Sequence, residues 1–463
     1  MESQTTAPAA RPVRHGWPTA LVLAGAMFLV LFDSLAVATA LPDIGAEFGV
    51  PPAQLQWVVT LYSLTIGGFL VLGGRVCDVW GRRRVIVASL ALTGTGLLLS
   101  GVAGTLALLL VGRVMQGLGA AFAIPAALAS AATLFPDEPW RSRVFSVVAA
   151  AANTAGMAGA VLGGVITSYL GWRWVFIVVV PAAALAAVAG LLLLPADEPS
   201  GSRRERLDVT GAALVTGGLL AVIYGATQIG EHGPGLATVS PVLAGVLMLN
   251  ALVWWERRVR NPIIKPSVVR SRRLVASCLA FGAHSAAYAA VVVVGSLQLQ
   301  DVYSLSAAQA GIALAPVLLG AVISAAPAGR LVRRYGSRRV VALALLLCSI
   351  TLALVAFGTA GSLTVLVVYL VLWGLSAGPI YVGLTRECIG DAAPEDRGLA
   401  SALFESTTHV GGAISVAVYL TMIGAGSGYS STQFIGAVVV GASVLTTLLI
   451  MPGAPARDPE HRA

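Results

Sequence analysis

Two opposite charges stand deep inside apolar runs of the sequence, and a charge in that setting is a candidate for chemistry. Asp33 lies about eight residues, or ~12 Å, inside the end of the first run at Leu41. Arg113 lies about nine residues, or roughly 13 Å, inside a run that follows Gly104. If these runs cross a bilayer, each charge is costly unless it is paired or hydrated. We therefore predict a functional site at Asp33 and Arg113, with a purely structural ion pair as the alternative.

A second pair of ionisable residues occurs near the end of the chain. Glu405 and His409 are four residues apart, so they share one face of a helix. Glu405 lies about seven residues past Gly398, roughly 10 Å from the edge of its run. The pair is predicted to form a second proton or substrate site. The alternative is a pair that simply reaches water on the cytoplasmic side.

The remaining polar candidates are scattered. His284 stands alone among Ala, Gly and Ser, so packing against a neighbouring helix is the favoured interpretation, and a place in a substrate cavity is the alternative. Arg173 lies between two tryptophans, which usually anchor a chain at a membrane interface; a substrate vestibule is the alternative interpretation. We expect the polar and aromatic lining of a substrate cavity to come from Tyr62, Gln116, Gln298 and Gln300. For the last two, a place in the outer mouth is the alternative.

One basic stretch occurs twice. Gly73 to Arg84 reads Gly-Gly-Arg-Val-Cys-Asp-Val-Trp-Gly-Arg-Arg-Arg, between two long apolar runs. Gly329 to Arg339 reads Gly-Arg-Leu-Val-Arg-Arg-Tyr-Gly-Ser-Arg-Arg, with the same spacing between its glycines. Each copy is predicted to be a short turn between two helices. The repetition indicates two homologous halves.

The composition shows which kind of structural element holds these residues in place. The chain has 463 residues, of which 57% are hydrophobic and 11% charged, whereas soluble domains carry roughly a quarter charged residues. Apolar runs of about 20 residues recur along it, and each is long enough to cross a bilayer as a helix. Continuous rather than alternating runs exclude a closed barrel. The sequence thus predicts an all-α polytopic membrane protein.

We predict fourteen membrane-spanning helices, arranged as six, two and six. The first is expected to end at Pro42, and Asp208 is expected to cap the seventh. The predicted parts are a cytoplasmic tail (1–16), an N-terminal six-helix half (17–194), a linker (195–208), two extra helices (209–255), a basic loop (256–273), a C-terminal six-helix half (274–451) and a second tail (452–463).

The net charge of +8 reflects how basic residues are distributed across the membrane. Basic residues fall in every second turn, and the alternate turns hold only Arg173. This positive-inside bias places both termini in the cytoplasm and removes the reason to expect a nucleic-acid partner. The four cysteines show no ligand spacing, and no phosphate-binding loop or nucleophile arrangement occurs, so we predict neither a metal site nor an enzyme.

Several motifs resemble the major facilitator superfamily, in particular its fourteen-spanner drug:proton antiporter family. The similarity covers essentially the whole chain. The motifs are Gly74 to Arg83, Arg113 to Ala121, Asp33-Ser34 through Leu41-Pro42, and Trp172-Arg173-Trp174. Three positions depart from the family pattern: Ala160 replaces a proline associated with export, Ala38 replaces an asparagine, and Arg333 replaces the acid of the second loop copy.

The resemblance implies that spans 1 and 4 lie side by side, so Asp33 and Arg113 would pair. Protonation of Asp33 would release Arg113, and deprotonation would attract a cationic substrate. Together with Glu405 and His409, these residues are the predicted proton-coupling groups. A conformational latch at the cytoplasmic rim would comprise Gly74, Arg75, Asp78, Gly81, Arg82 and Arg83, with an asymmetric counterpart because Arg333 cannot act as an acid.

The sequence as a whole predicts a proton-coupled secondary transporter that exports amphipathic or cationic small molecules, such as drugs and antibiotics, by alternating access. It would use the proton gradient and no cofactor, and would work as a monomer in the inner membrane of a bacterium. One alternative is a dedicated exporter of one natural product. Others are a proton symporter that imports a solute, which Ala160 leaves open, and a membrane sensor, which would need a soluble signalling domain.

Overall fold

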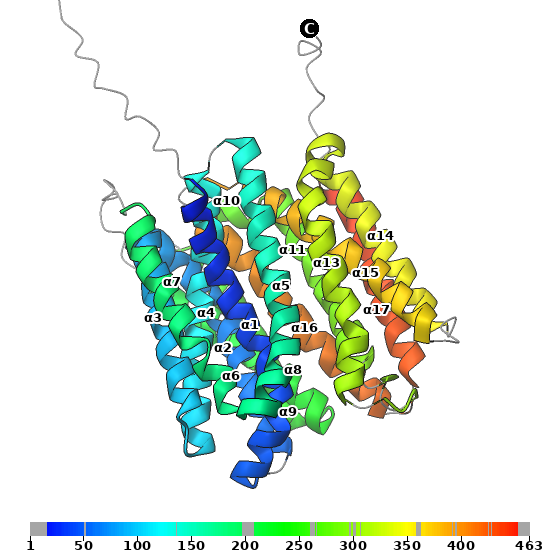
Figure 1. Ribbon diagram of the computed structural model, residues 1–463. Helices are drawn as coiled ribbons and strands as arrows, with labels where there is room; N and C mark the ends of the chain where they lie inside the picture. Colours follow the sequence, from blue (N-terminus) through cyan, green and yellow to red (C-terminus); the bar gives the residue numbers. More distant parts are fainter. Residues whose placement is uncertain are drawn as a thin grey trace, which may run out of the picture.

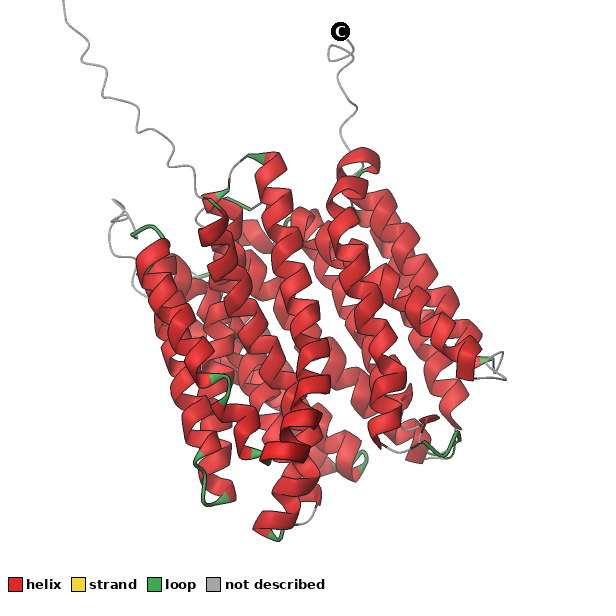
Figure 2. Cartoon of the chain, in the orientation of Figure 1, coloured by secondary structure: helices red, strands yellow, loops and turns green. Residues whose placement is uncertain are grey.

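The computed structural model describes residues 16–50, 52–135, 137–196, 208–259, 264, 266–295, 298–299, 302–305, 307–357, 363–390, 392–393, 396–424, 426 and 428–451. Every regular element in these ranges is a helix, and the long helices run side by side in one bundle (Figures 1 and 2). The start of α1 and the end of α17 lie at the same end of that bundle (Figure 1). Most of the predicted tails and linker lies outside the described residues.

The helices are described here in three groups along the chain. The first group comprises α1 (Trp17–Phe48), α2 (Pro52–Trp80), α3 (Arg82–Gly101), α4 (Leu106–Leu134), α5 (Glu138–Leu170), α6 (Arg173–Ile177) and α7 (Val180–Leu193). Next come α8 (Val209–His232), α9 (Leu236–Glu256) and the short α10 (Pro266–Val269). The last group comprises α11 (Arg272–Ala289), continued by the π-helical η1 (Ala290–Val294), then α13 (Ala307–Tyr335), α14 (Ser337–Ala356), α15 (Leu363–Gly390), α16 (Arg397–Gly424) and α17 (Gly428–Ile450).

Eleven helical segments of the described residues are long and apolar enough to cross a membrane, with α6 and α7 forming one segment. Three further long helices, α1, α5 and α16, have 32, 33 and 28 residues. The carboxylate of Asp208 accepts a hydrogen bond from the Gly211 amide at 3.0 Å, which confirms the predicted cap of α8.

The prediction that Pro42 ends the first helix is wrong. Helix α1 continues to Phe48, and the left-handed Gly49 ends it, with φ of +63°. Proline costs a helix one backbone hydrogen bond, but packing against neighbouring helices holds the chain in a bundle of this kind. Helices α4 and α15 likewise continue past Pro125 and Pro379.

The two basic stretches are more helical than predicted. Residues up to Trp80 belong to α2, and α3 starts at Arg82, so Gly81 alone breaks the helix. In the second copy, Gly336 alone separates α13 from α14. Gly81 has φ 95° and ψ 146°, and Gly336 has φ 82° and ψ 147°. Only glycine adopts such angles without strain, so the same hinge is built twice.

The pairing of helices repeats between the two groups. Helix α1 packs on α5 as α11 packs on α16, and α2 packs on α4 as α13 packs on α15. The groups meet where α2 packs on α16 and where α5 packs on α13. In both seams the second long helix of one group meets the fifth of the other, as two homologous halves require.

The extra helices have a defined place. Helix α8 packs against both α2 and α16, so it covers one seam between the halves, and α9 packs on α8. Glycines allow the close approach: a Cβ at Gly68 would lie 2.4 Å from Leu220, and one at Gly245 would lie 2.6 Å from the Gly218 carbonyl oxygen. Trp57 of α2 also stacks on Tyr224 of α8.

A polar cluster ties the end of α1 to its neighbours. The Glu47 carboxylate accepts hydrogen bonds from Trp172 Nε1 at 2.7 Å and from Arg173 Nη1 at 2.6 Å. Arg173 Nη2 donates to the Ala103 carbonyl oxygen at 2.8 Å. Trp172 is only 4% exposed, so it packs inside the bundle, whereas Trp174 is 46% exposed.

This cluster predicts a pH-dependent contribution to stability. The hydrogen bonds from Arg173 and Trp172 hold the pKa of Glu47 below its ordinary value of 4.5. The ionised carboxylate therefore stabilises the fold at pH values above the pKa that Glu47 has in the unfolded chain. This contribution is lost as the pH falls through the lower pKa of Glu47 in the folded protein. Glu47→Gln should lower the free energy of unfolding at pH 7 by an amount on the order of 1 kcal/mol for so exposed a pair, seen as a lower thermal unfolding midpoint, and the difference should shrink as the pH falls below 4.5. Asp43→Asn on the exposed side of the same helix is the control. A midpoint difference that does not change with pH would contradict the assignment.

Candidate functional site

The two charges predicted from the first and fourth apolar runs meet inside the N-terminal half. Arg113 Nη1 lies 2.5 Å from Asp33 Oδ2, and the two side chains are 0% and 2% exposed. The predicted pairing is confirmed. Because both charges are fully removed from water, removing one partner would leave the other uncompensated, at a cost of about 3–5 kcal/mol.

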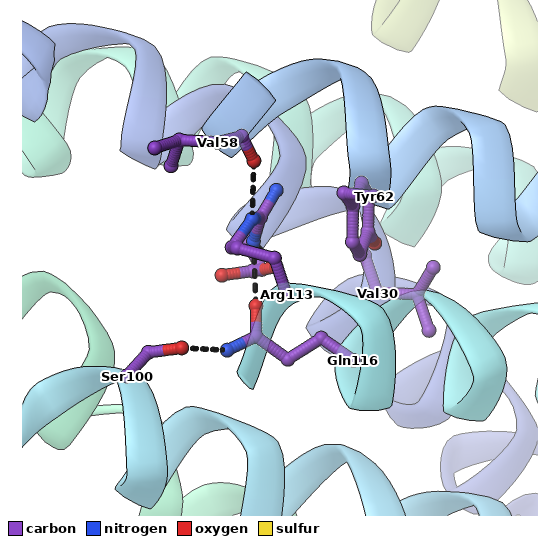
Figure 3. A network of polar contacts seen from close by, with 7 residues as sticks. Val30, Val58, Tyr62, Ser100, Arg113 and Gln116 are labelled. Atoms are coloured by element: carbon purple, nitrogen blue, oxygen red, sulfur yellow. Dashed lines mark hydrogen bonds and ion pairs between the residues drawn. The ribbon is translucent and has the colours of Figure 1, made fainter. Parts of the chain in front are cut away.

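Arg113 is held by more than its carboxylate (Figure 3). Its Nε donates to the Val58 carbonyl oxygen at 2.8 Å, and its Nη1 donates to Gln116 Oε1 at 2.5 Å. The guanidinium carbon lies 4.2 Å from the centre of the Tyr62 ring. These contacts, from α2 and α4, hold the guanidinium through groups other than Asp33.

Gln116 and Tyr62 in turn have partners of their own. Gln116 Nε2 donates to Ser100 Oγ on α3 at 2.9 Å, and Tyr62 Oη donates to the Val30 carbonyl oxygen on α1 at 2.7 Å (Figure 3). Both side chains are buried here, so they position Arg113 rather than line an open space in this conformation. Their place in a substrate cavity stays a prediction.

Two atoms of the pair can form further hydrogen bonds. Within the described residues, Asp33 Oδ1 and Arg113 Nη2 are buried and have no hydrogen-bond partner. A buried polar atom without a partner costs about 1–3 kcal/mol. The free carboxylate oxygen is therefore a place where a proton or a positively charged group would be stabilised.

The C-terminal half holds a carboxylate beside aromatic rings. Tyr381 Oη on α15 donates to Glu405 Oε1 on α16 at 3.0 Å. The ring of Phe281 stacks on that of Phe404 with centroids 4.3 Å apart, and it lies 5.7 Å from that of Tyr381. A carboxylate that faces aromatic rings can bind a cation by charge and by cation–π attraction.

The two histidines have different neighbours. His284 is 7% exposed and stacks on Trp373 with centroids 5.1 Å apart, which agrees with the favoured packing role. His409 lies against α2: a Cβ added at Gly67 of α2 would be 3.0 Å from the Cβ of His409. Thus Glu405 contacts α15 while His409 faces the other half. Whether the pair carries protons stays a prediction.

Gln298 accepts a hydrogen bond from Gln433 Nε2 on α17 at 2.7 Å, and both residues border a small cavity in the C-terminal half. Gln300 lies outside the described residues. The assignment of Gln298 to the substrate cavity stays a prediction.

The predicted latch residues lie where α2 meets α16. A Cβ at Gly74 would be only 2.4 Å from the Gly398 carbonyl oxygen, and one at Gly398 would be 2.5 Å from Asp78 Oδ1. Asp78 therefore faces the first turn of α16, whose amide groups carry the positive end of the helix dipole. Arg75 and Arg82 lie near enough to act on its charge.

The arginines around this seam make specific contacts. Arg82 Nη1 donates to Thr133 Oγ1 on α4 at 3.1 Å, and Arg83 donates to the Leu191 carbonyl oxygen on α7. Across the halves, Arg397 donates to the Ala132 carbonyl oxygen at 3.2 Å. In the second copy, Arg333 donates to Ser142 Oγ on α5 at 2.7 Å. The two seams are thus held by different chemistry, an acid at a helix start in one and an arginine on a hydroxyl in the other.

Sequence reasoning missed several members of these sites. Tyr381, Trp373 and the Phe281–Phe404 stack carried no local signal, because an aromatic residue in an apolar run is most often packing. Gly398 was one glycine among 52. Arg333 was expected only to make the latch asymmetric, and its hydrogen bond to Ser142 across the second seam was not foreseen.

Known proteins match this sequence over most of its length. The family model of the Major Facilitator Superfamily matches residues 23–283 and 276–463. The puromycin resistance protein pur8 of Streptomyces alboniger is 36% identical over 415 residues, which cover 88% of this chain and 82% of that protein. The cephamycin export protein CmcT of Amycolatopsis lactamdurans is 36% identical over 455 residues, which cover 95% and 92%. The lincomycin resistance protein of Streptomyces lincolnensis is 32% identical over 417 residues, which cover 88% and 85%.

One solved structure has the same fold. The crystal structure of the human organic anion transporter MFSD10 covers 95% of this chain and 100% of its own, with a TM-score of 0.69 and 17% sequence identity. At that identity the likeness concerns the arrangement of the helices alone.

Proposed function

The chain belongs to the Major Facilitator Superfamily, and from that premise we propose that it is a proton-coupled exporter of amphipathic small molecules. Members of this family are multi-pass membrane transporters rather than enzymes, and the relatives described above are resistance or export proteins. The observation that carries the proposal is the buried Asp33–Arg113 pair, in which one carboxylate oxygen has no partner among the described residues.

In the proposed mechanism, a proton and a cationic substrate compete for Asp33. When Asp33 binds a proton, its attraction to Arg113 weakens, but Arg113 stays in place because Val58, Gln116 and Tyr62 hold it. When Asp33 loses the proton, its free oxygen attracts the positive end of the substrate. Mutual exclusion at one carboxylate makes the exchange an antiport, driven by the proton gradient without a cofactor. Glu405, beside Tyr381 and Phe281, is the proposed second cation site.

Alternating access would occur around these carboxylates. The proposed topology has fourteen spans, with both termini in the cytoplasm of a bacterium. The two halves would rock about the α2–α16 and α5–α13 seams. Gly74, Asp78 and Gly398 would hold the cytoplasmic end closed, and the protein would act as a monomer. In this arrangement α8 would keep one seam covered during the motion, because it contacts both halves.

The second candidate is a dedicated exporter of one natural product. The names of three relatives each refer to a single antibiotic, namely puromycin, a cephamycin and lincomycin. A broad exporter and a dedicated one would share the fold and the coupling residues, and they would differ in the cargo alone.

The test is transport in proteoliposomes under an imposed pH gradient. The panel would contain an amphipathic dye cation, puromycin, a cephamycin and lincomycin. We expect gradient-driven transport of the dye and of at least one antibiotic, abolished when the gradient is collapsed by an ionophore. Transport of one antibiotic alone would favour the dedicated exporter. Transport of several compounds at the same rate with and without the pH gradient would contradict proton coupling.

A further inference from the structure

A large apolar cavity lies between the extra helices and the C-terminal half. It has a volume of about 610 Å³, and α8 and α9 form one wall through Leu219 and Leu252. Helices α11, α16 and α17 form the other walls. Along α16 it extends from Leu403 to Tyr419, or ~24 Å at 1.5 Å per residue. We call it the lateral groove. Its length exceeds the ~15 Å of one hydrocarbon leaflet.

The lateral groove opens toward the outside of the bundle. Several residues of its wall are also exposed on the bundle surface, among them Leu279 (51%), Ile414 (46%) and Val418 (44%). In a membrane these side chains face lipid tails. The occupant therefore reaches the groove from the bilayer.

The few polar groups in the groove are already satisfied by the protein. The hydroxyls of Ser406, Thr407 and Ser415 donate to carbonyl oxygens of their own helix. Tyr419 Oη donates to the Ala286 carbonyl oxygen on α11 at 3.2 Å. These hydroxyls have no hydrogen left to donate to a ligand, and a hydrocarbon chain would break none of their bonds. The wall chemistry thus fits acyl chains.

The cytoplasmic mouth of the groove is basic. Arg272, at the first turn of α11, is exposed and stands seven and eleven residues before Leu279 and Ala283, so helical periodicity places all three on one stripe. Arg257, Arg258 and Arg270 are exposed at the same end. The acids at this end are already held by protein groups. Glu256 is 7% exposed and accepts from the Ile264 amide at 3.1 Å, Asp208 accepts from Trp255 Nε1 at 2.9 Å, and Glu387 lies 3.8 Å from Arg273.

A tryptophan marks the level of the membrane surface at this mouth. Trp254, near the end of α9, is 58% exposed, and the Arg258 guanidinium lies 3.4 Å from the centre of its ring. Tryptophan and arginine together are typical of the headgroup layer. The basic residues are therefore at the depth where a lipid phosphate lies.

We propose that the lateral groove binds an anionic phospholipid of the cytoplasmic leaflet, with its acyl chains along α16 and its phosphate at Arg272. The lipid fills the space between the extra helix pair and the C-terminal half. Because it packs against α8 and α16 together, it gives α8 a deformable contact beside the seam that α8 covers. This inference does not depend on the transported substrate or on proton coupling.

The proposal can be tested by native mass spectrometry of the full-length protein in detergent. Phosphatidylglycerol and phosphatidylcholine with identical chains would be added in parallel. We expect wild type to retain one phosphatidylglycerol, with a preference of about fivefold over phosphatidylcholine, since one surface cation contributes that much toward an anionic headgroup. Arg272→Gln should remove the preference and leave chain binding. Ala283→Trp should obstruct the groove and weaken retention of the lipid.

Matched controls separate the groove from ordinary lipid contact. Leu343→Trp places the same bulk on an exposed face of α14, and Arg330→Gln removes an exposed arginine from α13, so both should bind lipid as wild type does. A phosphatidylglycerol with a photoactivatable group on its chain gives a second readout that needs no variant. Its adducts should concentrate on residues 279–286 and 410–418. Equal retention of both lipids by wild type, undiminished binding in Ala283→Trp, or adducts spread evenly over α3 and α14 would each overturn the proposal.

Discussion

Asp33→Asn is expected to reduce pH-gradient-driven transport to the level of protein-free liposomes. Asparagine keeps the shape of the side chain and a hydrogen bond to Arg113 Nη1, but it can neither release a proton nor carry a negative charge. It also leaves Arg113 buried without a counter-charge, at a cost of about 3–5 kcal/mol, although Val58 and Gln116 still hold the guanidinium. The measurement is uptake of a dye cation by proteoliposomes with and without a pH gradient.

The matched control is Asp43→Asn, on an exposed position of the same helix, which should transport as wild type does. A wild-type elution profile and an unfolding transition that stays above the assay temperature distinguish loss of coupling from loss of folding, and Asp33→Glu should restore part of the activity. If Asp33→Asn transports the dye as fast as wild type under the gradient, Asp33 does not couple protons. Glu405 would then be the next residue to replace.

Gly74→Ala is expected to weaken the closure of the cytoplasmic end and to lower the transport rate by about tenfold, through an overpacking cost of roughly 1–3 kcal/mol. The added methyl group would lie 2.4 Å from the Gly398 carbonyl oxygen and 2.7 Å from Ala402 Cβ. Neither contact is the flexible end of a side chain, so α2 and α16 must separate. Separation also moves Asp78 away from the start of α16.

The structural readout is the distance between spin labels at positions 84 and 390, one on each half, in a background without the four native cysteines. The distance distribution should shift toward longer values in Gly74→Ala. Gly25→Ala on α1 is the control, because a methyl group there has no atom within 4 Å. An unchanged distribution together with reduced transport would refute a latch at this contact and point to a local packing defect.

Much of the fold follows from local patterns. Apolar runs of membrane length predict helices because backbone groups in lipid must be paired within the segment. The repeated basic stretch predicts two halves, and its glycines predict the hinges at Gly81 and Gly336. Pro42 misled the prediction because tertiary packing overrides a local helix breaker in a bundle.

By itself, the sequence determined that the chain is a helical membrane protein with a repeated half, and that Asp33 and Arg113 form its first functional candidate. Only the tertiary structure decided that Asp78 faces α16, that Tyr381 binds Glu405, that Gln116 braces Arg113, and that α8 covers a seam and borders a groove. The physical reason is that a membrane helix is apolar on nearly every side, so its composition does not show which face meets which neighbour. Those contacts depend on small residues and single polar groups whose partners lie far away in the chain.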